Sequence, residues 1–129
     1  MDTTNMIFVF GSNLRGVHGA GAARFAYLHK GAMHGVGVGI RGKSYALPTK
    51  DVRINTLSLY DIEGFVDMFI EYAKCWPGVQ FQVTRVGCGL AGYKDKDIAP
   101  MFVHAPANCF FDSAWEPWFG ETKQYWGTM

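Results

Sequence analysis

The segment Val79–Tyr93 reads VQFQVTRVGCGLAGY and contains the clearest change of pattern in the chain. Apolar and polar residues alternate over Val79–Val86, which is the two-residue period of a strand. The glycine-rich stretch Gly87–Tyr93 then predicts a loop. Asp95–His104, with acids in its first turn and a proline near its start, predicts a helix. A strand that leads through a glycine loop into a helix is typical of α/β domains.

Strands and helices also alternate in the rest of the chain. The other predicted elements are a strand at Met6–Phe10, a helix at Ala20–Lys30, a short strand at Ser44–Leu47, a helix at Asp61–Trp76 and a strand at Cys109–Phe111. Ser58 is a candidate cap for the long helix, and Pro48 should end the short strand. This order predicts an α/β fold with a central parallel or mixed sheet and helices on both sides, in about three layers.

A second glycine-rich loop, FGSNLRGVHGAG at Phe10–Gly21, follows the first predicted strand. Both loops follow a strand and precede a helix, so both should open at the carboxyl edge of the sheet, where such folds bind ligands. Loops of this kind present backbone N–H groups that suit a diphosphate. The alternative is that each loop is only a tight turn. The spacing matches neither the dinucleotide motif GxGxxG nor the phosphate-loop motif GxxxxGK[ST].

The composition excludes several classes of protein. The chain has 129 residues, 49% of them hydrophobic, and a net charge of +1, which argues against bulk nucleic-acid binding. No apolar run approaches the roughly 20 residues of a membrane span, and we expect no signal peptide. Three widely spaced cysteines fit free thiols in a reducing cytoplasm. The sequence predicts no metal site and no cofactor.

The loop Gly87–Tyr93, in its place between a strand and a helix, resembles the second phosphate loop of macrodomains. The likeness is closest to the branch that contains terminal ADP-ribose glycohydrolase, which removes ADP-ribose from glutamate. Gly19-Ala-Gly21 resembles the first loop of that branch, and SYALPTK at Ser44–Lys50 resembles its strand ending in Thr-Lys. The resemblance covers roughly residues 6–105. It implies one macrodomain-like domain over residues 1–129, with the aromatic tail Trp115–Met129 packed on it, and ADP-ribose or a derivative as the ligand.

The resemblance also implies roles for individual residues. Asn13 would orient the distal ribose, Lys50 would attack its anomeric carbon, and Tyr93 would lie against the proximal sugar. The implied ligand-binding set is Gly11, Ser12, Asn13, Gly19, Ala20, Gly21, Gly87, Cys88, Gly89, Leu90, Ala91, Gly92 and Tyr93. For Cys88 a second reading is a small residue packed under the loop.

The chain departs from the family at the positions of its acids. Ala91 and about Ala23 stand where catalytic aspartates are found, and Asp2 is a poor match for the adenine-binding aspartate. Asp51, beside Lys50, and His18, in the first loop, are the candidates for a replacement acid or base. Each has a structural alternative, because Asp51 is equally a turn acid and His18 equally a packed or exposed histidine. Arg15 is either a phosphate clamp or an exposed loop residue.

These observations predict a protein that binds ADP-ribose or a derivative and hydrolyses a bond at the distal ribose. The alternative is a non-catalytic reader or sequestering protein for an NAD-derived metabolite, which the two alanines favour. The partner is then a nucleotide, either free or attached to a macromolecule. A third class is an interaction protein that uses the aromatic side chains of the tail.

Overall fold

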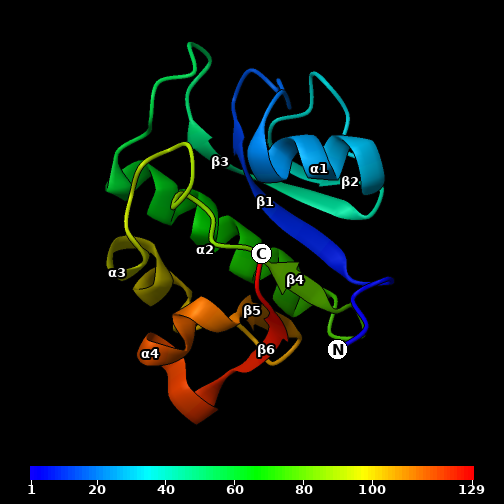
Figure 1. Cartoon of the computed structure of the whole chain (residues 1–129), viewed down its shortest axis with the longest axis vertical. Coiled ribbons are helices and arrows are strands. Elements are labelled where there is room, and N and C mark those ends of the chain that lie inside the picture. Colours follow the sequence, from blue (N-terminus) through cyan, green and yellow to red (C-terminus); the bar gives the residue numbers. More distant parts are fainter.

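Strand β1 (Ile7–Asn13) lies near the middle of a six-stranded sheet in the computed structural model, which describes all 129 residues (Figure 1). The strand order is β2-β3-β1-β4-β5-β6, and every neighbouring pair is parallel except β2 with β3. The remaining elements are α1 (Gly21–His29), β2 (Gly39–Arg41), β3 (Ser44–Lys50), α2 (Leu59–Cys75), β4 (Phe81–Val83), α3 (Asp95–Ile98), β5 (Cys109–Asp112), α4 (Glu116–Phe119) and β6 (Gln124–Gly127), with 3₁₀ helices at Ala99–Phe102, Ser113–Trp115 and Gly120–Thr122.

The two faces of β1 pack against different helices because successive side chains of a strand point to opposite sides. Phe8 and Phe10 pack with the alanines of α1, whereas Val9 belongs to the larger core under α2. Helices α1 and α2 therefore lie on opposite faces of the sheet (Figure 1). The α/β class, the mixed sheet and the helices on both faces agree with the sequence-based prediction.

Helix α1 covers only part of the sheet face on which it lies. Over β4 and β5 the same face carries Gln82 and Phe110, which are paired in register. A small cluster of Met6, Phe110 and Trp126 closes the face there. The sheet thus has a helix on both sides at β1 and β3, where the candidate site forms.

Five elements differ from the predictions. Pro48 does not end β3, which continues to Lys50, because the pairing register with β1 shifts opposite it, between Ser12 and Asn13. An irregularity in the ladder is where a strand tolerates a residue without an N–H. The predicted strand at Val79–Val86 is shorter, and the predicted helix after it divides into α3 and a 3₁₀ helix. The short strands β2 and β6 were not predicted.

The aromatic tail packs on the body of the protein, as expected. The side chain of Trp115 is completely buried, and the indole of Trp126 donates a hydrogen bond to the carbonyl of Val83. β6 extends the sheet beside β5. Trp115, Phe119 and Trp126 of the tail therefore belong to the core, whereas Trp118 is exposed. The longest helix has 17 residues, and none of the helices combines the length and apolar character needed to cross a membrane.

Close packing of Gly37 against the first loop gives a test of the fold. A Cβ at Gly37 would overlap the carbonyl oxygen of Asn13, whereas a Cβ at Gly64, exposed on α2, would meet nothing. We expect Gly37→Ala to lower the free energy of unfolding by about 1–3 kcal/mol through forced displacement of the loop. Gly64→Ala should raise it by about 0.5–1 kcal/mol, since alanine favours a helix. Urea unfolding measures both, and a Gly37→Ala protein as stable as wild type would contradict this packing.

Candidate functional site

A cavity of about 750 Å³ opens at the carboxyl edge of the sheet, between the two glycine-rich loops. This volume is within the range of small-molecule sites, roughly 300–1,000 Å³. The floor includes Gly11, at which a Cβ would lie 3.4 Å from both the backbone nitrogen of Gly87 and the Thr49 hydroxyl. Leu90 of the second loop reaches over the cavity, since its Cδ1 is 3.7 Å from the Cβ position of Gly21. The two loops therefore meet around one cavity, as the strand order predicted.

The first loop presents the uncapped start of α1 to the cavity. No side chain caps this helix at Ala20, and the backbone N–H groups of residues 19–23 donate to no acceptor in the protein. Gly19, Ala20, Gly21, Ala22 and Ala23 all line the cavity. The first N–H groups of a helix carry partial positive charge and bind anions when no cap satisfies them.

The second loop supplies further N–H groups without partners. Within it, the N–H groups of Cys88, Gly92 and Tyr93 bond to carbonyls of the same segment, which fixes the loop shape. The backbone N–H groups at residues 87, 89, 90 and 91 donate to nothing in the protein. Gly87 has a φ of +79°, which side chains rarely tolerate. The helix that follows, α3, has only four residues and carries its own acids, so the loop N–H groups are the main attraction for an anion here.

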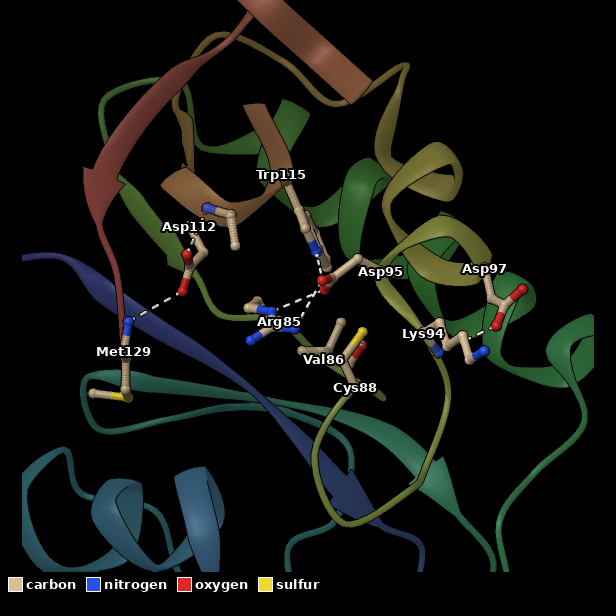
Figure 2. A network of polar contacts seen from close by, with 10 residues as sticks. Arg85, Val86, Cys88, Lys94, Asp95, Asp97, Asp112, Trp115 and Met129 are labelled. Carbon is tan, nitrogen blue, oxygen red and sulfur yellow. Dashed lines mark hydrogen bonds and ion pairs between the residues drawn. The ribbon is translucent and has the colours of Figure 1, made fainter. Parts of the chain in front are cut away.

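An ion pair holds the two ends of the second loop together (Figure 2). Nε and Nη2 of Arg85, just before the loop, donate to the two carboxylate oxygens of Asp95, just after it, at 2.8 and 2.7 Å. The Trp115 indole donates to the same carboxylate at 2.8 Å. These hydrogen bonds, those from Arg85 above all, hold the pKa of Asp95 below its ordinary value. The two ends are therefore fixed by a bidentate contact.

The opposite side of the second loop is attached to the segment after β3. The Thr56 hydroxyl donates to the carbonyl of Ala91 at 3.0 Å, and the Tyr93 hydroxyl donates to the carbonyl of Leu57 at 2.7 Å. Tyr93 packs against the core under α2 and does not line the cavity, and neither does Gly92. Its expected contact with a sugar is thus replaced by a role in holding the loop.

Lys50 and Asn13, to which the resemblance gave roles at the distal ribose, belong to the cavity. Both line the cavity, at the ends of β3 and β1. Asn13 uses its amide on the neighbouring turn, since Nδ2 donates to the Val17 carbonyl and Oδ1 accepts from the Val17 N–H. One N–H of the amide is left for a ligand. The Lys50 ammonium makes no ion pair or hydrogen bond in the protein.

The two candidate acid or base residues lie outside the cavity lining. The Asp51 carboxylate accepts the backbone N–H groups of Arg53 and Asn55, so it is a turn acid. His18 is buried, and its Nε2 lies 3.0 and 3.1 Å from the carbonyls of Met33 and Val36. Asp51 is therefore a turn acid and His18 is a buried, packed histidine, and neither side chain lines the cavity.

Cys88 is a packing residue and Arg15 is an exposed loop residue, which are the second readings that the sequence allowed for them. Burial raises the pKa of the Cys88 thiol to about 12, with a further contribution from Asp95. The thiol donates to the carbonyl of Val86 at 3.6 Å, so Cys88 is a protonated packing residue at the cavity wall. Arg15 is exposed and does not line the cavity.

Sequence reasoning missed Arg85, which lines the cavity as its second cation after Lys50. A signal was present, because Arg85 directly precedes the second glycine loop at the end of a predicted strand. The other unpredicted lining residues are Val17, Ala22, Ala23, Phe25, Thr49, Ile54, Thr84, Val86 and Met129. No aspartate, glutamate or histidine lines the cavity, and no three His, Cys, Asp or Glu side chains are grouped to hold a metal ion. The charged side chains of the lining are thus both cations, which suits an anion.

The pair of Arg85 with Asp95 predicts a pH-dependent stability. We expect Asp95→Asn to lower the free energy of unfolding by roughly 1–2 kcal/mol at pH 7, since the pair is partly exposed. Because the pKa of Asp95 is lowered in the folded state, this stabilisation is present above the unfolded pKa of about 4 and is lost as pH falls through the folded pKa. The difference between wild type and variant should therefore shrink below pH 4.

Urea unfolding at pH 7 and at pH 3 measures this difference. The exposed Asp67 on α2, which makes no hydrogen bond, provides the control, because Asp67→Asn should change stability by less than about 0.5 kcal/mol. A difference for Asp95→Asn that persists unchanged at acid pH would show that the ion pair does not carry the effect.

Comparison with known proteins gives no relative from which a role can be transferred. No protein-family model matches the chain, and no curated protein or solved structure matches it.

Proposed function

We propose that this protein binds ADP-ribose, or a derivative with the same diphosphate, in the cavity between the two glycine loops. The observation that carries the proposal is the set of backbone N–H groups around the cavity that donate to no protein acceptor. They belong to both loops, so they face a ligand from two sides, and a diphosphate has enough acceptor oxygens for both sets. The resemblance of GCGLAGY and GAG to macrodomain loops supports the same ligand.

The charges of the lining also support this proposal. Lys50 and Arg85 line the cavity, and no carboxylate side chain lines it to repel a phosphate. The ribose nearest Lys50 would meet the remaining N–H of Asn13. The free thiols of Cys75, Cys88 and Cys109 fit a reducing compartment, which supports a cytoplasmic location as part of this proposal.

Calorimetric titration with ADP-ribose tests the proposal. We expect a Kd in the micromolar range or below for wild type, with AMP and NAD titrated alongside. Gly89→Glu should weaken ADP-ribose binding by at least about tenfold, because it places a carboxylate in the phosphate loop where a Cβ meets no other atom. Gly78→Glu, the same change at an exposed glycine after α2, should bind like wild type.

Absence of heat with all three nucleotides would contradict the proposal. Equal binding by wild type and the Gly89→Glu protein would place the ligand elsewhere on the molecule. Thermal unfolding of the two glutamate variants checks that each is folded.

A second candidate function is hydrolysis at the distal ribose, favoured by the unpaired Lys50 in the lining. After losing a proton to water, the Lys50 amine would attack the anomeric carbon through its Nζ. The bond from that carbon to the leaving oxygen would break with its electron pair on the oxygen, which takes up a proton, and water would then replace Nζ on the carbon and release the ribose. This route needs an acid for the leaving group, and neither Asp51 nor His18 lines the cavity. The non-catalytic reader is therefore the better supported of the two functions.

The Lys50→Ala variant tests the second candidate. If the protein is a hydrolase, this change should reduce release of ADP-ribose from a glutamate-modified protein by at least about 100-fold while ADP-ribose still binds, since the lost amine acts on the reaction. Mass analysis of the ligand before and after incubation measures the release. Full activity in the variant would exclude Lys50 as nucleophile, and intact substrate with wild type would support the reader.

A further inference from the structure

The turn after β3 holds one residue in a backbone conformation that its side chain disfavours. Ile54 has a φ of +64°, and no other residue apart from glycines has a positive φ. In this left-handed region the Cβ of an L residue comes close to the following carbonyl oxygen, and a β-branched residue is a clear outlier there. Glycine or asparagine is the usual residue at such a position. The isoleucine therefore carries a conformational cost.

Hydrogen bonds around Asp51 impose this conformation. The N–H of Ile54 donates to the carbonyl of Asp51 at 3.1 Å, and the N–H of Asp51 donates to the carbonyl of Asn55 at 2.8 Å. The Asp51 carboxylate accepts the N–H groups of Arg53 and Asn55. Strained residues persist where the surrounding contacts fix them in this way, and they concentrate at functional sites. The turn thus holds the Ile54 side chain in a defined place.

Packing within the protein does not account for an isoleucine at this position. Ile54 is 37% exposed, and it belongs to none of the three apolar clusters that form the core. It lines the cavity between the two glycine loops instead. The conformational cost is therefore matched by no gain in the core, and its visible result is apolar surface in the cavity.

Ile54 is one of three exposed aliphatic residues in the cavity lining. The others are Val17 of the first loop and Leu90 of the second loop. Residues that line a cavity and still remain exposed lie at its opening. Inorganic phosphate has no apolar surface that could cover such side chains, whereas the C–H face of a sugar has. The opening is therefore suited to an uncharged, carbon-rich part of a ligand.

The position of Ile54 indicates which part of the ligand it would meet. Its turn starts directly after Lys50, whose backbone pairs with Thr56 at the other end of the turn, beyond the carboxyl end of β3 (Figure 1). The Thr56 hydroxyl joins this segment to the carbonyl of Ala91 in the second loop. Lys50 and the remaining N–H of Asn13 are donors on this side of the cavity, and donors suit sugar hydroxyls.

We propose that Ile54 is a specificity-determining residue that packs on the terminal ribose of the ligand, and that its strained backbone serves this contact. The proposal rests on the proposed function, since it assigns one residue of the same cavity to one part of ADP-ribose. By covering the C–H face of this sugar, Ile54 favours a diphosphate that carries a second ribose over one that ends at its phosphate.

Calorimetric titration with ADP-ribose and with ADP, which lacks the terminal ribose, tests the proposal. In Ile54→Gly we expect ADP-ribose to bind about tenfold more weakly than in wild type, and ADP to bind within about twofold of wild type. Each ligand is compared with itself, so the extra charge of ADP does not enter. Val52→Gly is the matched control, because Val52 is an exposed aliphatic residue of the same turn that does not line the cavity. This control should bind both ligands like wild type.

Thermal unfolding without ligand gives a readout that a packing role would not produce. Glycine relieves the strain at φ +64°, and the exposed side chain contributes little to the core. The unfolding midpoint of Ile54→Gly should therefore lie within about 4 °C of wild type or above it. Ile54→Asn, which tolerates the left-handed region and keeps the turn less flexible than glycine, should give the same midpoint and the same loss of ADP-ribose affinity. A larger fall in both variants would show that Ile54 stabilises the fold, which would overturn the proposal.

The outcomes also separate this proposal from the proposed function. If wild type does not bind ADP-ribose, both are overturned. If wild type binds ADP-ribose and both Ile54 variants bind it equally well, the proposed function stands and this proposal is overturned. Equal weakening of ADP and ADP-ribose would place Ile54 against the part that the two ligands share, which also contradicts the proposal. If ADP gives no heat with wild type, the terminal ribose is essential for binding, and the loss of ADP-ribose affinity in the two variants decides.

Discussion

The candidate site depends on the parallel hydrogen bonding of β1 with both of its neighbours. Parallel strands end at the same edge, so pairing β1 with β3 and β4 brings the loop after β1, Lys50 and the loop after β4 around one cavity. An antiparallel neighbour would place one of the loops at the far edge. The two-sided core enforces this pairing, because Phe8 and Val9 must each find their own layer and a one-residue slip would exchange them.

Within that frame, side chains hold the loops so that backbone groups stay free. Asn13 closes the turn to Val17, Arg85 and Asp95 fix the second loop, and Tyr93 attaches it to the segment after β3. Free N–H groups at a cavity are stable because water satisfies them until a ligand arrives, whereas a dry interior would not tolerate them. Polar residues near the site therefore hold the shape of the loops, and backbone N–H groups remain without a partner in the protein.

This division explains which parts of the molecule could be predicted from the sequence. Periodicity predicted α2 well, because this helix buries a large apolar face, and it predicted α1 to within one residue at each end. It predicted only the first part of β1, which continues through Gly11 to Asn13 into the stretch expected to be a loop, because pairing with β3 keeps these residues in the sheet. It failed at Pro48, where a register shift lets the strand continue, and at β2 and β6, whose short segments gain their strand form from a neighbour rather than from their own pattern. Glycine spacing located both loops of the cavity.

The roles of single polar residues were harder to predict, because a side chain that holds a loop and one that binds a ligand look alike in sequence. His18, Asp51 and Tyr93 all lie close to the loops, yet their hydrogen bonds go to backbone carbonyls or N–H groups of neighbouring segments. Arg85 was the opposite case. Only the contact with Asp95, ten residues later, shows that its guanidinium is held at the cavity.

The groups that line the cavity also bear on whether the protein only binds its ligand or also cleaves it. An enzyme must bind the transition state more tightly than the substrate, and the free donors here would match a charge that the proposed diphosphate ligand already carries in the ground state. Cleavage at a ribose develops charge at the anomeric carbon and on the leaving group, where an acid or a base is needed. The lining offers the Lys50 amine and the Cys88 thiol, and the thiol, with a pKa of about 12, is neither an acid nor a base near neutral pH. This set of groups therefore favours the proposed binding of a diphosphate over its cleavage, and turnover would require a substrate that brings its own proton donor.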